Sequence, residues 1–111
     1  MEIFQGKTHL PGADTDWDIT LEIDWAEEDV TVRVAQAPGG IAEWPGLAVQ
    51  AFGPVEEIAF RTRGIPPSFT HWWHLVRGEH DELSGVILAT PDARGVWRTC
   101  LITMAKVGNR E

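Results

Sequence analysis

The sequence has too few cysteines for an internal disulfide, and it has no long hydrophobic run. Cys100 is the only cysteine among 111 residues, so the chain carries no sign of an oxidising compartment. No apolar stretch approaches the roughly 20 residues that a membrane-spanning helix needs. The first residues, MEIFQGK, contain an early glutamate and lack the apolar stretch of a signal peptide. We therefore expect a cytoplasmic protein without a membrane partner.

Basic residues are also scarce, and tyrosine is missing. Nine Lys and Arg stand against 17 Asp and Glu, which gives a net charge of −8. Residues 1–55 hold ten acidic residues against only Lys7 and Arg33, whereas residues 56–111 hold seven residues of each sign. An acidic surface repels phosphate groups, so we do not expect a nucleic-acid partner. Six tryptophans supply most of the aromatic surface, and tryptophan is common in cores and interfaces.

The spacing of glycine and proline predicts an all-β protein. These residues interrupt the chain about every ten positions, and the segments between them alternate apolar with polar residues. At most one helical turn, at 41–44, is indicated. The length fits a single domain, 1–111, with one core. We predict an eight-stranded, up-and-down antiparallel β-barrel, with strands near 2–9, 16–25, 30–37, 47–52, 56–63, 70–77, 82–90 and 96–107.

The segments 17–25 and 30–34 form the clearest predicted hairpin. In the first of them every second residue is Trp, Ile or Leu, and the residues between them are Asp, Glu or Thr. A turn over 26–29 pairs Ile23 with Val32 and sets Arg33 opposite Glu22. Apolar side chains then face one another and opposite charges meet, which is the consistency that fixes a register.

The last three predicted strands can be registered in the same way. A turn over 79–80 pairs His74 with Gly85 and Trp72 with Ile87, and a turn within 91–94 sets Ile87 opposite Arg98. Both faces of these strands are then largely apolar, and an apolar outer face usually marks a contact with a partner. We therefore expect a homodimer through the outer face of the C-terminal strands. The residues expected on that face are His71, Trp73, Leu75, Val86, Leu88, Trp97, Thr99 and Leu101.

Five short motifs are spread over nearly the whole chain: Phe4-Gln5-Gly6, Pro38-Gly39-Gly40-Ile41, Ile58-Ala59-Phe60, Leu83-Ser84-Gly85 and Gly95-Val96-Trp97. This pattern resembles that of small lipocalin-like (calycin-like) β-barrel domains, particularly those found beside α/β hydrolases in bacteria. The resemblance implies a barrel with a ligand cavity. It also implies that Gly85 and the residues alternating with it face inward, which favours the face of Trp72, His74, Arg98 and Cys100 as the lumen. The chain departs from the pattern at His74, where an aromatic or aliphatic residue is usual.

An arginine inside an apolar barrel needs a partner, because an isolated buried charge costs several kcal/mol or more. A carboxylate such as that of Glu56, Glu57 or Glu82 could pair with Arg98, and so could an acidic ligand. We therefore expect the lumen to bind a small hydrophobic molecule with a polar or acidic end. His74 and Arg98 would meet its polar group. The apolar wall would consist of Trp17, Phe60, Trp72, Ile87 and Cys100, with Trp44 folding over the barrel mouth or lying at a subunit contact.

Two other functions fit the same residues. A cofactor-independent isomerase or cyclase would use His74 to move a proton and Arg98 to polarise a carbonyl. An interaction module would have a packed lumen and an apolar outer face that binds another chain. Arg98 could also lie at the barrel rim with its head in water, and Cys100 could be a small buried apolar residue. We expect no cofactor and no metal, since His71 and His74 are three residues apart and point to opposite faces of a strand.

Overall fold

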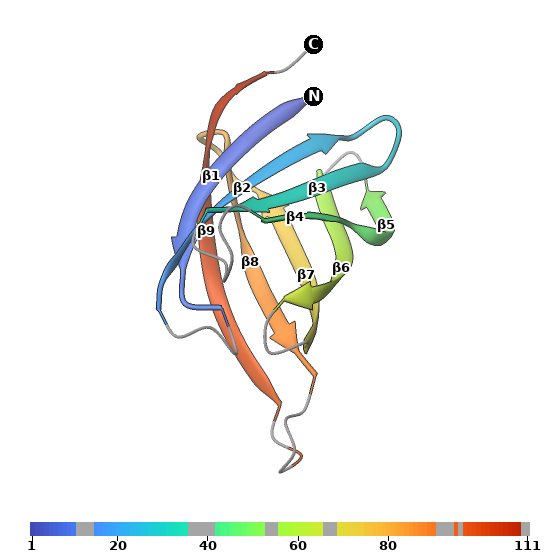
Figure 1. Ribbon diagram of the computed structural model, residues 1–111. Helices are drawn as coiled ribbons and strands as arrows, with labels where there is room; N and C mark the ends of the chain where they lie inside the picture. The colour runs from blue at the N-terminus through green and yellow to red at the C-terminus, as the bar shows by residue number, and fades with distance from the viewer. Residues whose placement is uncertain are drawn as a thin grey trace.

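The computed structural model describes residues 1–10, 15–35, 42–52, 56–65, 69–90, 95 and 97–109. Most of these residues lie in antiparallel strands that form an up-and-down, nearly closed barrel (Figure 1), which confirms the predicted fold class. The hydrogen-bonded order is β4-β3-β2-β1-β9-β8-β7-β6-β5. No helix long and apolar enough to span a membrane occurs in the described ranges. The strands are β1 (Glu2–Thr8), β2 (Trp17–Asp24), β3 (Asp29–Val34), β4 (Ala42–Pro45), β5 (Leu47–Phe52), β6 (Glu57–Ile65), β7 (Phe69–Arg77), β8 (Glu82–Ala89) and β9 (Arg98–Asn109).

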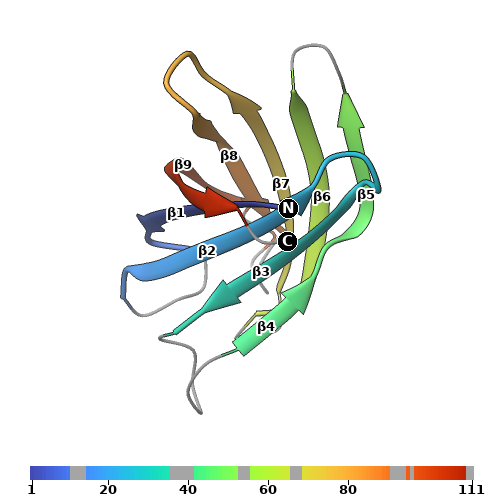
Figure 2. The ribbon, with the colours of Figure 1, turned by 90° about the horizontal axis from the view of Figure 1, so that it is seen from above.

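The described residues form nine strands rather than eight, because one segment bends at Gly46 and belongs to both edges of the sheet. β4 pairs with β3 and β5 pairs with β6, and only Gly46 separates β4 from β5. The chain itself therefore joins the two edges, as the view from above shows (Figure 2). Gly46 N donates a hydrogen bond to Val30 O at 2.8 Å, and a Cβ on Gly46 would overlap the Val30 side chain. The helical turn expected at 41–44 is wrong for residues 42–44, which belong to β4; Ile41 lies outside the described residues.

The pairing of β2 with β3 keeps the predicted faces but not the predicted register. Ile23 lies opposite Val30 instead of Val32. A shift of two residues leaves each side chain on its original face, so the alternation still predicted correctly which residues are buried. Arg33 is not directly opposite Glu22, but its Nη1 reaches diagonally and donates to Glu22 Oε1 at 2.8 Å.

The register predicted between β7 and β8 is wrong by one residue. Trp73, rather than Trp72, lies opposite Ile87. A shift of one residue moves every side chain of a strand to its other face. Trp73 and Leu75 are therefore buried in the interior, at 1% and 0% exposure, whereas Trp72 and His74 point outward.

The turn between β7 and β8 explains this shift. Gly78 N donates to Glu82 O at 2.7 Å, and Asp81 adopts a left-handed φ of 54°. A left-handed residue in a hairpin loop adds a residue to one side, as in a bulged turn, and so changes the register of the strands that follow it. β9 is displaced by two residues from the prediction, with Ile87 opposite Cys100 instead of Arg98, and its faces are therefore as predicted.

Apolar side chains fill the barrel interior. The rings of Phe60 and Trp73 stack with 5.4 Å between their centroids, and Trp73 Nε1 donates to Thr62 Oγ1 at 3.0 Å. Gly85 allows β8 to approach β7 closely, because a Cβ there would overlap the backbone carbonyl of His74. The fully buried set includes Phe4, Leu10, Ile19, Leu21, Ile23, Val32, Ile58, Trp73, Leu75, Leu83, Ile87 and Met104.

Candidate functional site

The residues predicted to form one lumenal site divide between the inside and the outside of the barrel. Trp17, Phe60 and Ile87 are inside, with at most 3% of each exposed. Cys100 and Trp44 are partly buried against the same core. The Trp44 ring stacks parallel to that of Trp17, with 6.4 Å between the centroids, and packs against the core from β4. These five side chains belong to the packed interior.

The other three predicted residues are not in the interior. The His74 side chain is 57% exposed on the outer face of β7, and Trp72 is 38% exposed on the same face. Arg98, at the start of β9, is exposed as well. The expectation that His74 and Arg98 point together into the lumen is therefore wrong for His74, because of the one-residue shift of β7.

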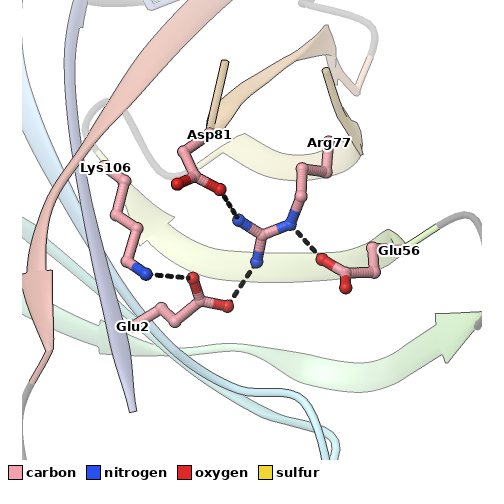
Figure 3. A network of polar contacts seen from close by, with 5 residues as sticks. All are labelled: Glu2, Glu56, Arg77, Asp81 and Lys106. Carbon is pink, nitrogen blue, oxygen red and sulfur yellow. Dashed lines mark hydrogen bonds and ion pairs between the residues drawn. The ribbon is translucent and has the colours of Figure 1, made fainter. Parts of the chain in front are cut away.

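The arginine that points inward from β7 is Arg77, at the end of the strand, where 15% of its side chain is exposed. Its guanidinium donates hydrogen bonds to Glu2, Glu56 and Asp81, the last at 3.0 Å (Figure 3). Lys106 Nζ lies 3.0 Å from the second carboxylate oxygen of Glu2. The sequence argument correctly required carboxylate partners, including Glu56, for an inward arginine, but it assigned them to Arg98.

Each charge in this network has a partner, and two aromatic rings cover it. The guanidinium carbon of Arg77 lies 5.4 Å from the ring centroids of Phe4 and Trp25. Burial alone would raise the pKa of Glu2, but its hydrogen bonds and ion pairs with Arg77 and Lys106 outweigh burial and hold the pKa below its ordinary value of 4.5. Burial would lower the pKa of Arg77, and its carboxylate partners raise it above the usual value. A network whose charges already satisfy one another suits a structural role.

A groove of about 540 Å³ lies on the outer face of β5, β6, β7 and β8. Its floor consists of two rows of side chains that run across these strands. The hollow arises because alanines stand among long side chains in both rows. One row holds Gln50, Ala59, His74 and Val86, and the other holds Arg61, Trp72 and Leu88, with Ala48 beside it in the irregular part of β5.

Arg61 is the cation of this groove. It lies directly opposite Trp72 across β6 and β7. Its Nε is buried and makes no hydrogen bond within the part of the chain that the structure describes. A buried donor without an acceptor costs about 1–3 kcal/mol, so an acceptor that entered the groove would relieve this cost. A carboxylate suits a guanidinium best, because its two oxygens match the planar N–H groups.

His74 supplies a second polar group to the same groove. Its Nε2 contacts Glu57 Oε1, so the carboxylate orients the imidazole ring. Glu57 is the residue at the start of β6, two positions before Ala59 of the groove floor. Val86 is the partner of His74 on β8, which places an apolar surface on its other side. The groove therefore combines an apolar floor with polar groups at separate points, as small-molecule sites commonly do.

The β5 edge of the groove contains a strained residue. The pairing of β5 with β6 is irregular between Leu47 and Gln50, and Ala48 has a left-handed φ of 52°. A non-glycine residue pays for this conformation, and such residues and bulges are common beside functional sites. The bulge places Ala48 and Gln50 on the same groove wall.

The sequence contained one signal for Arg61 that the prediction did not use. Ile58, Phe60 and Thr62 alternate with Ala59 and Arg61, and the inward position of Phe60 was predicted. The same alternation places Arg61 outside, beside the short Ala59. The same alternation could not show that Trp72 lies beside Arg61, because the face on which Trp72 lies depends on the β7–β8 turn.

The remaining reactive groups do not form a second centre. Burial raises the pKa of the Cys100 thiol, although a hydrogen bond with Thr8 opposes this effect. A thiol with a raised pKa is a poor nucleophile at neutral pH. Among the described residues, no group of three or more His, Cys, Asp or Glu side chains could hold a metal ion.

No family model, no curated protein and no solved structure matches this chain.

Proposed function

We propose that this protein binds a small hydrophobic molecule that carries a carboxylate, in the outer groove of β5–β8. The observation that carries the proposal is the buried, unpaired Nε of Arg61 directly opposite the exposed ring of Trp72. The ligand class is the one that the sequence predicted, but the site is different. The packed side chains of the interior favour the outer groove over the lumen.

The chemistry of the groove fits such a ligand in two parts. The guanidinium of Arg61 would donate two charge-assisted hydrogen bonds to the carboxylate oxygens. The Trp72 ring and the side chains of Val86 and Leu88 would cover the apolar part, which is driven from water by the hydrophobic effect. A groove of about 540 Å³ lies within the usual range for small-molecule sites, roughly 300–1,000 Å³.

A titration followed by tryptophan fluorescence tests this proposal. Octanoate and 3-phenylpropionate should change the emission, and the matched alcohols should bind at least about tenfold more weakly because they cannot satisfy the guanidinium. Arg61→Gln should weaken carboxylate binding by a similar factor. Arg63→Gln is the matched control, because Arg63 lies on the same strand, is exposed and does not line the groove. Equal binding of acids and alcohols, or an unchanged affinity of Arg61→Gln, would overturn the proposal.

The isomerase hypothesis is favoured only by the position of His74. Its ring lies in the groove and is held by Glu57, so it could move a proton of a bound molecule. The polarising role would pass from Arg98 to Arg61, because Arg98 does not line the groove. His74→Ala should then abolish turnover of a bound carbonyl compound but leave its binding within about threefold. An equal loss of binding and turnover would argue against catalysis.

We also propose that the barrel is of the lipocalin-like (calycin-like) class and that it associates with an α/β hydrolase. The up-and-down order of the strands supports the classification. Gly85, whose inward orientation the resemblance implied, does alternate with the inward Leu83 and Ile87.

A further inference from the structure

The outer face of β7, β8 and β9 carries almost no charge. We call it the uncharged face, and define it by the outward side chains of these strands together with Trp97. Within the described residues, the titratable side chains at outward positions of these strands are His74 and Glu82, and Arg98 is exposed at the start of β9 beside Trp97. On β9 the outward residues from Thr99 to Val107 include no charged side chain at all. By contrast, the outward positions of β2 include Asp18, Glu22 and Asp24.

The uncharged face is also apolar and open to solvent. Leu101 is 77% exposed and Trp97 is 54% exposed. The rings of Trp72 and Trp97 lie 6.0 Å apart, so aromatic surface continues from β7 to the start of β9. A continuous exposed apolar surface of this kind usually marks an interaction site, and tryptophan is typical of the centre of an interface. The other exposed apolar side chains on this face are Val76, Val86 and Val107.

The net charge of −8 indicates what covers this face. Two copies of an acidic chain repel each other wherever their charged surfaces approach. Among the described residues, this face is a surface on which two copies bring few like charges together. A basic partner would instead be attracted to the acidic strands, where the charge is, and not to this face. A two-fold interface brings the same surface of both copies together. Two uncharged surfaces do not repel each other, so this face meets that requirement.

We propose that the protein forms a two-fold homodimer through the uncharged face, with Leu101 and Trp97 in the contact. This proposal goes beyond ligand binding. The uncharged face shares Trp72, His74, Val86 and Leu88 with the groove, so a second copy and a ligand would compete for these side chains. The two proposals are tested through residues that they do not share. Leu101 does not line the groove, and Arg61 is not on β7–β9. Three strands spaced about 4.8 Å apart offer an interface at the lower end of the usual size range. The dimer should therefore dissociate upon dilution into the micromolar range.

Sedimentation equilibrium over protein concentrations from about 1 μM to about 1 mM tests this inference. The average mass of the wild-type chain should rise from 12.3 kDa towards twice that value. Leu101→Asp should weaken the dimer at least about tenfold, because it places a charge of the same sign on both sides of the contact. Trp97→Asp should weaken the dimer by a similar factor. Agreement between the two variants would show that the weaker dimer does not come from a folding defect in one of them.

Phe52→Asp is the matched control. Phe52 is 46% exposed, so the change replaces another exposed apolar side chain by the same charge, but Phe52 lies on β5, outside the uncharged face. This variant should dimerise like the wild type. A wild-type chain that stays monomeric throughout, or that forms larger open assemblies, would overturn the proposal. An equal weakening by Phe52→Asp and Leu101→Asp would overturn it as well.

Discussion

Arg61 and Trp72 lie directly opposite each other across β6 and β7, both on the outer face of the barrel. The pair brings a guanidinium with a buried, unsatisfied N–H next to a ring that is 38% exposed. An ion-binding group and an apolar surface are thereby offered at adjacent positions of one groove. This juxtaposition is the basis of the proposed ligand site.

The two neighbouring tryptophans of β7 should respond to substitution in different ways. Trp73→Phe should lower the free energy of unfolding by about 2 kcal/mol, because it removes buried ring volume and the hydrogen bond to Thr62. Trp72→Phe should change it by less than about 0.5 kcal/mol, since the ring is on the surface. Urea unfolding measures both values. The reverse order would show that the faces of β7 are assigned incorrectly.

Removal of the Arg77 guanidinium should destabilise the barrel. Arg77→Met should cost about 2 kcal/mol at pH 7, because Glu2 is left partly buried beside other carboxylates without its main cation. The cost is moderate because Glu56 and Asp81 are about half exposed or more and can turn to water. Arg63→Met, on an exposed part of β6, is the control and should leave the urea midpoint unchanged.

The stability supplied by Glu2 should depend on pH. Because the folded-state pKa of Glu2 lies below its ordinary value, the carboxylate contributes stability that is fully present above pH 4.5. This contribution is lost as the pH falls through the folded-state pKa. Glu2→Gln should be about 1 kcal/mol less stable than the wild type at pH 7, because it weakens the hydrogen bonds to Arg77 and Lys106. The difference should shrink as the pH falls below 4.5, since the folded-state pKa of Glu2 is lowered. A difference that stays constant down to pH 2.5 would contradict this role of Glu2.

Backbone strain at Ala48 predicts a substitution that makes the protein more stable. Ala48→Gly should stabilise the protein by about 0.5–1 kcal/mol, because glycine adopts the observed φ of 52° without steric cost. Ala51→Gly, at a regularly paired position of the same strand, should instead destabilise it by a similar amount. Thermal unfolding of both variants would measure the difference. A loss of stability in both would argue that Ala48 is not strained.

The alternation of apolar residues was sufficient to predict the barrel and most of its interior. A register error of two residues, as between Ile23 and Val30, does no harm to such a prediction, because it preserves the face of each side chain. The extra strand could not be predicted from alternation. It depends on the bend at Gly46, where close contact with Val30 excludes a side chain.

The candidate site was less predictable than the fold. β7 carries apolar or aromatic residues on both faces, so its pattern was compatible with either orientation. The β7–β8 turn, with the left-handed Asp81, decided between them. Because of this single residue, Trp72 and His74 lie outside the barrel and Trp73 lies within it. The requirement that an inward arginine be paired was sound, but it applied to Arg77.

The location of the ligand can be measured most directly by two-dimensional ¹H–¹⁵N NMR of the labelled protein during titration with octanoate. The largest shift changes should belong to the indole N–H of Trp72 and to backbone amides near Ala59, Arg61 and Val86. In Arg61→Gln the same changes should require at least about tenfold more octanoate. Changes concentrated instead at the indole groups of Trp17 and Trp44, which do not line the groove, would place the ligand elsewhere and contradict the proposed site.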